Sequence, residues 1–245
     1  MLVSVFFFAL QMLSINNTSM IDPMVSESNN PSDSFVLQYL IREPKVKAEK
    51  NKAIILLHGV GSNEQDLFSL AGQLPDDFYI IAARGPFALG GGRFAWYNVD
   101  FSTGRPVIDV EQELSSRNTI HRFVSQIKQK YHIDQLYLGG FSQGAIMSFS
   151  VALTYPNEVN QVIALSGRIL EQHQVGVVPN DSFRKLNVFL SHGTQDGTLP
   201  IQYAREAKTF LEKLNVQLSY HEYNLGHSIN NDVLKDLNRW LQKNE

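Results

Sequence analysis

The sequence has no cysteine among its 245 residues. Disulfides, thiolate metal sites and cysteine nucleophiles are therefore excluded. An excess of positive charge is lacking too, because 21 Lys and Arg stand against 24 Asp and Glu, a formal net charge of −3. A nucleic-acid partner, which usually shows as clustered basic residues and a high isoelectric point, is not expected.

Long apolar runs are lacking as well. A helix that crosses a bilayer needs about 20 apolar residues, and the apolar stretch at the start covers only residues 1–13. No Lys or Arg precedes Arg42 and no Ala-x-Ala follows the stretch, so a secretory signal has little support. Residues 16–34 are rich in Asn, Ser, Asp and Pro, a composition typical of disorder. We therefore expect no stable membrane span, a disordered tail or leader over residues 1–33, and one folded domain over residues 34–245.

Three interpretations of residues 1–33 stay open. They are a weak signal or lipid-proximal leader, a segment upstream of a true start at Met20 or Met24, and a natural flexible tail. An untargeted or mis-started tail is favoured and predicts a cytoplasmic protein, with export through a weak leader as the alternative. The sequence leaves the oligomeric state open, and a homodimer is among the states that it allows.

From residue 34 onward, segments typical of strands alternate with segments typical of helices. Strands are predicted at residues 35–41, 53–57, 79–83, 136–138, 162–165, 188–191 and 217–223. Helices are predicted at residues 62–73, 110–131, 145–153, 201–214 and 229–242. A capping box of Ser62 and Gln65 would open the first helix. The alternation predicts an α/β fold, with a mostly parallel central sheet and helices on both faces.

In two segments the apolar residues show neither the spacing of a helix nor that of a strand. Residues 87–106, which contain three consecutive glycines, are predicted to form a long loop. Residues 168–186 are predicted to form a loop with at most one short element. The strand at 35–41 is expected at an edge of the sheet. The helix at 110–131 is amphipathic, and its predicted apolar side carries Leu114, Ile120, Val124 and Ile127.

The most informative segment runs from Leu136 to Met147. A short apolar strand leads into Gly-x-Ser-x-Gly, with Ser142 at its centre, and then straight into a helix. That order is typical of the nucleophile elbow of a serine hydrolase, in which a tight turn exposes the serine hydroxyl above the sheet. A glycine-rich turn of any α/β protein is the alternative, but the flanking strand and helix favour the elbow.

A serine hydroxyl needs a base to take its proton and a carboxylate to hold that base in one tautomer. In the α/β-hydrolase order both partners follow the serine. The candidates are the acids Asp181, Asp196, Glu222, Asp232 and Asp236 and the bases His173, His192, His221 and His227. Asp196 is favoured because it follows a buried strand, and His227 because it lies between the last strand and the last helix. We expect His192, at a strand end, to tie down the neighbouring loop.

Stabilising the oxyanion requires two backbone N–H groups. Gln143, directly after the nucleophile, is the candidate for one of them. Val60, in the loop after the strand at 53–57, is the candidate for the other, and Gly59 and Gly61 would let this loop approach the substrate. His58 is expected to brace the loop.

Four motifs occur in the order of one known family. They are Leu57-His58-Gly59-Val60-Gly61, Gly140-Phe141-Ser142-Gln143-Gly144-Ala145, His192-Gly193-x-x-Asp196 and Gly226-His227-x-Ile229. Over about residues 50–242 the chain resembles the phospholipase/carboxylesterase family, which includes the acyl-protein thioesterases and small bacterial carboxylesterases. The resemblance implies an α/β-hydrolase fold and a Ser142–Asp196–His227 triad. It also implies an oxyanion hole from the Val60 and Gln143 N–H groups, and hydrolysis of a small-molecule ester or thioester without cofactor or metal.

Two departures from the family pattern bear on the substrate. Acyl-protein thioesterases tend to have an acidic residue after the Gly-x-Gly turn, where this sequence has Ser62-Asn63. The Arg84-Gly85-Pro86 turn and the glycine-rich segment after it look more like the bacterial esterases. Both favour small or medium acyl esters. Trp96 and Phe87 are candidates for the substrate pocket, with burial as core aromatics as the alternative.

The predicted function is therefore that of a serine carboxylesterase. An acyl-protein thioesterase or a lysophospholipase is the first alternative, and a non-catalytic binding protein on the hydrolase scaffold is the second. The binding protein is disfavoured because every triad and oxyanion position has the residue type that catalysis needs. A peptidase ranks lower, since the sequence suggests neither an acidic specificity pocket nor a lid.

Overall fold

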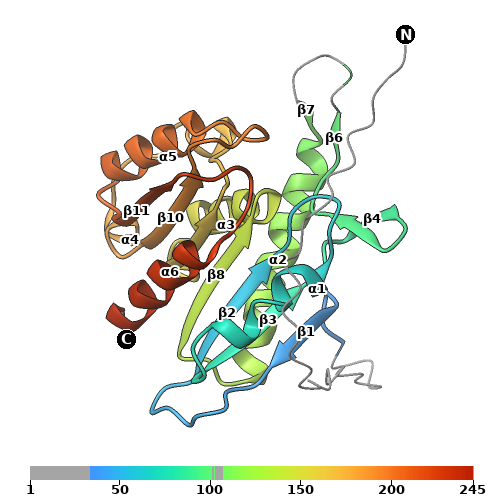
Figure 1. Ribbon diagram of the computed structural model, residues 1–245, viewed down its shortest axis with the longest axis vertical. Helices are drawn as coiled ribbons and strands as arrows, with labels where there is room; N and C mark the ends of the chain where they lie inside the picture. The colour runs from blue at the N-terminus through green and yellow to red at the C-terminus, as the bar shows by residue number, and fades with distance from the viewer. Residues whose placement is uncertain (1–33, 101, 103–106, 245) are drawn as a thin grey trace.

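The apolar runs of the sequence form one seven-stranded sheet in the order β1-β3-β2-β8-β9-β10-β11 (Figure 1). The structure, a computed structural model, describes residues 34–100, 102 and 107–244, so the expectations about residues 1–33 lie outside it. The strands of this sheet are β1 (Tyr39–Arg42), β2 (Lys52–Leu57), β3 (Phe78–Ala83), β8 (Gln135–Phe141), β9 (Gln161–Leu165), β10 (Asn187–Gly193) and β11 (Gln217–Tyr223). Only β1 is antiparallel to its neighbour, and it lies at an edge as predicted.

Helices cover both faces of the sheet, which confirms the predicted α/β architecture. Successive side chains of a strand point to opposite faces, and β2 follows this rule: Ala53, Ile55 and Leu57 belong to one buried cluster, while Ile54 and Leu56 belong to the other. The first cluster is covered by α2 (Val110–Lys130), α3 (Gln143–Thr154) and α5 (Gln202–Lys213). The second is covered by α1 (Glu64–Phe68) and α6 (Asn231–Lys243), and Figure 1 shows α6 crossing in front of the strands.

The predicted capping box at the first helix is wrong. Asn63 caps α1 instead, since its side chain accepts a hydrogen bond from the Gln65 N–H at 2.9 Å. The Ser62 hydroxyl donates to Asp66 at 2.8 Å. Ser and Asn are comparable caps, so the pattern alone could not separate two adjacent residues. The helix also ends earlier than predicted, and a separate 3₁₀ turn, η1, follows at Ala71–Gln73.

The long loop predicted at residues 87–106 is wrong as well. A hairpin of β4 (Phe87–Gly90) and β5 (Arg93–Ala95) occupies its first half. The three glycines at its tip have φ angles of +82°, +61° and +72°. Glycine adopts such angles without steric cost. The three glycines that interrupt the strand pattern of the sequence therefore form the turn of the hairpin. The short strands β6 (Val99–Asp100) and β7 (Val107–Ile108) pair beyond it.

Two smaller expectations also need correction. Leu114 is 45% exposed, although it was predicted on the apolar side of α2. Counting back four and seven residues from the buried Ile120 gives Ser116 and Glu113, which are buried in its place. Residues 168–186 hold two short elements, the 3₁₀ turn η2 (Glu171–His173) and α4 (Asp181–Arg184), where at most one was expected.

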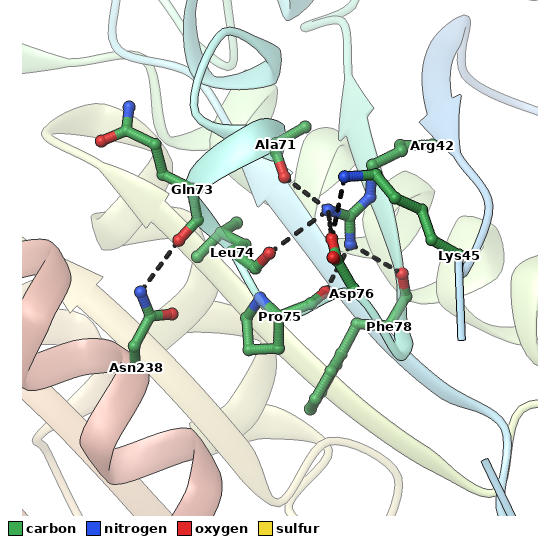
Figure 2. A network of polar contacts seen from close by, with 9 residues as sticks. All are labelled: Arg42, Lys45, Ala71, Gln73, Leu74, Pro75, Asp76, Phe78 and Asn238. Carbon is green, nitrogen blue, oxygen red and sulfur yellow. Dashed lines mark hydrogen bonds and ion pairs between the residues drawn. The ribbon is translucent and has the colours of Figure 1, made fainter. Parts of the chain in front are cut away.

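Arg42, at the end of β1, holds the segment that leads from η1 into β3 (Figure 2). Its Nη1 donates to the carbonyls of Ala71 at 2.6 Å and Leu74 at 3.2 Å. Its Nη2 donates to those of Pro75 at 2.5 Å and Phe78 at 3.1 Å. One guanidinium therefore donates to four backbone carbonyls.

Replacing Arg42 by lysine is expected to lower the free energy of unfolding by about 1–3 kcal/mol, because a single ammonium cannot reach four carbonyls and leaves some unsatisfied. Urea unfolding would measure this loss. Arg239→Lys is the matched control, since Arg239 is exposed and pairs with Asp236, three residues away. An Arg42→Lys midpoint equal to that of the wild type would contradict the bracing role.

Candidate active site

Ser142 lies in a sharp turn between β8 and α3, with φ of 54° and ψ of −117°. A non-glycine residue rarely adopts a positive φ, and such strain is concentrated at functional sites. The Ser142 N–H donates to the Leu165 carbonyl at 2.9 Å, which fixes the turn against the end of β9. The predicted nucleophile therefore lies at the carboxyl edge of the sheet, where ligands of open α/β sheets bind.

The two glycines that flank this turn are required by close packing. A Cβ on Gly144 would lie 1.8 Å from the Leu57 carbonyl oxygen, and one on Gly140 would lie 2.5 Å from the same atom. Helix α3 therefore starts directly against the end of β2, the strand that leads into the predicted oxyanion loop.

Asp196 and His227, the predicted acid and base, are in direct contact. The His227 Nδ1 lies 2.6 Å from Asp196 Oδ2, so the proton of this ring nitrogen is donated to the carboxylate. The other oxygen, Asp196 Oδ1, accepts the backbone N–H groups of Thr198 at 2.9 Å and Leu199 at 2.8 Å. The carboxylate is thereby held on both sides, and among the described residues His227 forms its side-chain hydrogen bond through Nδ1 alone, which leaves Nε2 for proton transfer.

Burial by itself raises the pKa of Asp196. Hydrogen bonds from His192 and His227, and from the Leu199 N–H, outweigh it and hold that pKa well below its usual range. The group stays ionised at neutral pH, which is the state that stabilises an imidazolium.

The His227 ring also packs on Phe141, with the ring centroids 4.7 Å apart. Phe141 directly precedes Ser142. The loop between β11 and α6 therefore carries His227 to the end of β8, beside the predicted nucleophile.

His192 braces the acid loop, as predicted. Its Nε2 lies 2.7 Å from the Leu199 carbonyl and 3.3 Å from Asp196 Oδ2. Three other candidate acids form ion pairs away from this histidine: Asp181 with Arg184, Glu222 with Arg205 and Asp236 with Arg239. Among the other candidate bases, His173 pairs with Glu113, and the ring of His221 stacks on Phe189.

The predicted oxyanion loop passes directly in front of the serine. A Cβ on Gly59 would lie 3.5 Å from the Cβ of Ser142. The next residue, Val60, is 49% exposed. Backbone hydrogen bonds pin the loop to β5: the Gly61 N–H donates to Phe94 at 2.9 Å, and the Phe94 N–H donates to Ser62 at 2.8 Å. The hairpin that the sequence did not predict is thus the support of this loop.

His58 and Trp96, which are both buried, brace the same loop. The His58 Nε2 accepts the Gly85 N–H at 2.9 Å, and its Nδ1 donates to the Gly59 carbonyl at 2.7 Å. Burial lowers the pKa of His58, although the Gly59 carbonyl and Glu64 oppose this, so the ring is neutral. The Trp96 indole donates to the His58 carbonyl at 2.9 Å. The predicted bracing role of His58 is confirmed.

The candidate pocket residues have different positions. Trp96 is 0% exposed, so it offers no surface to a substrate, and the alternative role as a core aromatic holds for it. Phe87 is half-buried at the start of β4. A pocket role for Phe87 stays a prediction.

Gln143 has a second function that the sequence did not suggest. Its side-chain oxygen accepts the Trp96 N–H at 2.8 Å, and its side-chain nitrogen donates to the Tyr97 carbonyl at 2.7 Å. This amide joins the first residue of α3 to the segment after β5. No local pattern signals such a link, because it joins residues 46 and 47 positions apart.

The described residues contain neither a membrane-spanning helix nor a metal-binding cluster. No helix there is both long and apolar enough to span a membrane. No group of three or more His, Asp or Glu in that part of the chain is arranged to hold a metal ion.

The sequence is similar to those of known proteins. A sequence profile described as Phospholipase/Carboxylesterase matches residues 39–245. Acyl-protein thioesterase 1 of Kluyveromyces lactis is 31% identical over 215 residues, which cover 80% of this chain and 94% of the yeast protein. Carboxylesterase SOBER1 of Arabidopsis thaliana is 27% identical over 155 residues, which cover 61% of this chain and 67% of the plant protein.

Solved structures share the fold. The Bacillus cereus carboxylesterase superposes with a TM-score of 0.71 at 22% identity, covering 84% of this chain and 94% of its own. The Zea mays acyl-protein thioesterase 2 superposes with a TM-score of 0.69 at 20% identity, covering 84% of this chain and 98% of its own. At these identities the likeness establishes the fold alone.

Proposed function

This chain belongs to the phospholipase/carboxylesterase family of α/β-hydrolases, and on that premise we propose that it is a serine esterase with Ser142 as nucleophile, His227 as base and Asp196 as the acid that orients the base. The observation that carries the proposal is the strained serine at the sheet edge, next to a histidine hydrogen-bonded to a buried carboxylate. The catalytic domain proposed is residues 34–245.

The proposed reaction has two halves. The His227 Nε2 takes the hydroxyl proton of Ser142, whose oxygen attacks the ester carbonyl, and the backbone N–H groups of Val60 and Gln143 stabilise the oxyanion. The imidazolium then protonates the leaving alcohol, which departs and leaves an acyl-serine. In the second half His227 deprotonates a water, which attacks the acyl-serine, and the carboxylic acid leaves as the proton returns to Ser142. No cofactor takes part.

The side chain of Gln143 gives a test of the oxyanion hole. We expect Gln143→Glu to lower kcat/KM by roughly 10²-fold or more, because a carboxylate repels the developing oxyanion and cannot donate to Tyr97. Gln143→Met is the matched variant, since it loses the same hydrogen bonds without adding charge and should retain more activity. Steady-state hydrolysis of one short ester compares the variants. Equal activity of Gln143→Glu and the wild type would show that the side chain at this position does not support the oxyanion hole.

The proposed substrates are small or medium acyl esters. An acyl-protein thioesterase is the second candidate, and the observation that favours it is the yeast relative of that name at 31% identity. A lysophospholipase shares the preference for long acyl chains with this second candidate.

The deciding experiment is kcat/KM on p-nitrophenyl esters from acetate to palmitate. A maximum at short chains supports the carboxylesterase. A maximum at long chains supports the thioesterase or the lysophospholipase. Activity on none of them would leave a specialised substrate or the binding-protein alternative.

A further inference from the structure

Arg168 is a cation near the proposed site, and within the described part of the chain it has no acidic partner. Among residues 34–100, 102 and 107–244, no Asp or Glu forms an ion pair with it. The arginines that do pair there are Arg42, Arg84, Arg117, Arg184, Arg205 and Arg239. The Nε atom of Arg168 is buried and has no hydrogen-bond partner. Arg42 and Arg117 also have a buried Nε without a hydrogen-bond partner, but each of them pairs with an acidic residue, so the unbalanced charge is the feature of Arg168 that a ligand would satisfy.

The backbone of Arg168 lies beside the nucleophile turn. It follows Leu165 by three residues, and the Leu165 carbonyl accepts the Ser142 N–H at 2.9 Å. The intervening Gly167 packs so closely on α3 that a Cβ there would lie 2.6 Å from the Cβ of Ala145. The chain therefore leaves the sheet at the carboxyl end of β9, and Arg168 follows next to the first turn of α3.

Two tyrosines are neighbours of the Arg168 side chain. Its guanidinium lies 5.1 Å from the ring centroid of Tyr203, in the first turn of α5, the helix that follows the Asp196 loop. Its charge also acts on the hydroxyl of Tyr97, where burial raises the pKa and Arg168 opposes this rise. The carbonyl of Tyr97 is held by the Gln143 amide.

A guanidinium has five N–H donors in a planar fork that matches a carboxylate. The face of Tyr203 stabilises the charge, but it accepts none of these hydrogen bonds. A single guanidinium neutralises one carboxylate, whereas a phosphate dianion would leave a charge unbalanced. A carboxylate is therefore the ligand that fits.

We propose that Arg168 binds a carboxylate carried by the substrate, so that the enzyme prefers half-esters of dicarboxylic acids to neutral esters of the same length. This inference rests on the proposed esterase function and adds the substrate class to it.

Monoethyl glutarate and ethyl valerate form a matched pair, because the carboxylate of the first replaces the terminal methyl group of the second. We expect the wild type to have the higher kcat/KM on monoethyl glutarate in a pH-stat assay. Arg168→Leu should lower that value roughly 10- to 100-fold, as expected for a lost hydrogen bond between charged groups. It should leave the value on ethyl valerate within about threefold. Arg205→Leu, which removes the same charge from the outside of α5, should alter neither.

The outcomes separate the two proposals. Hydrolysis of ethyl valerate with no preference for the half-ester, or an equal loss on both esters in Arg168→Leu, overturns the carboxylate site and leaves the esterase standing. If neither ester is hydrolysed in a Ser142-dependent way, the esterase proposal is overturned, and the inference falls with it. If Arg168→Leu does not fold, salt provides the test in the wild type. Added NaCl should lower kcat/KM on the half-ester alone, and an equal response of both esters overturns the carboxylate site.

Discussion

Replacing Ser142 by alanine is expected to lower kcat on a short ester by about 10⁵- to 10⁶-fold, which is the loss that removal of the nucleophile causes in a serine hydrolase. The oxyanion donors and the binding site remain, so a small residual rate above that of water should persist. Alanine keeps the strained backbone and loses only the hydroxyl, so the fold should survive. Stopped assays at high enzyme concentration would measure the residual rate, and circular dichroism would confirm the fold.

The structure offers a matched control for this change. Ser166 lies at the end of the neighbouring strand β9, is also buried, and has a positive φ of 51°. The proposal gives it no chemical part, so Ser166→Ala should retain activity within a few-fold. If Ser166→Ala loses as much activity as Ser142→Ala, burial and strain rather than the nucleophile would explain the loss.

Replacing Asp196 by asparagine is expected to lower kcat by about 10⁴-fold. The reason lies in the hydrogen bonds of the carboxylate. Asp196 Oδ1 accepts two backbone N–H groups, from Thr198 and Leu199, and Oδ2 accepts His227 Nδ1. An asparagine has one oxygen, and the two backbone donors will hold it.

The amide NH₂ must then face His227. It can only donate, so Nδ1 of the ring must give up its proton and accept instead. The proton moves to Nε2, which can then no longer take a proton from Ser142. The geometry therefore predicts a folded protein with the wrong histidine tautomer.

Asp181→Asn is the control for this prediction. Asp181 was the next candidate acid, but its exposed carboxylate pairs with Arg184 in α4. Its replacement should leave kcat unchanged. Full activity of Asp196→Asn would mean that the acid lies elsewhere. A loss of activity in Asp181→Asn would then identify Asp181 as that acid.

Much of the architecture follows from short-range patterns. The continuous apolar run of β2 predicts a strand buried on both faces, and its residues do alternate between the two cores. The ends of such strands predict where chemistry can gather. Asp196 and His227, chosen for their places after β10 and β11, prove to be hydrogen-bonded to each other.

The features that sequence reasoning missed depend on contacts between distant residues or on fine local choices. Nothing around Gln143 indicates that its amide will hold Trp96 and Tyr97. Arg42 likewise has four carbonyl partners about 30 residues away. The β4–β5 hairpin was missed for a different reason, because its turn glycines are typical of loops as well.

If Ser142 is the nucleophile, a reagent that traps activated serines covalently should react with it. The protein would be treated with a fluorophosphonate, and the adduct located by intact mass and peptide mapping. We predict one adduct per chain, on Ser142, with labelling retained in Ser166→Ala and absent in Ser142→Ala. An unlabelled wild type, or an adduct on another residue, would show that Ser142 is not the nucleophile.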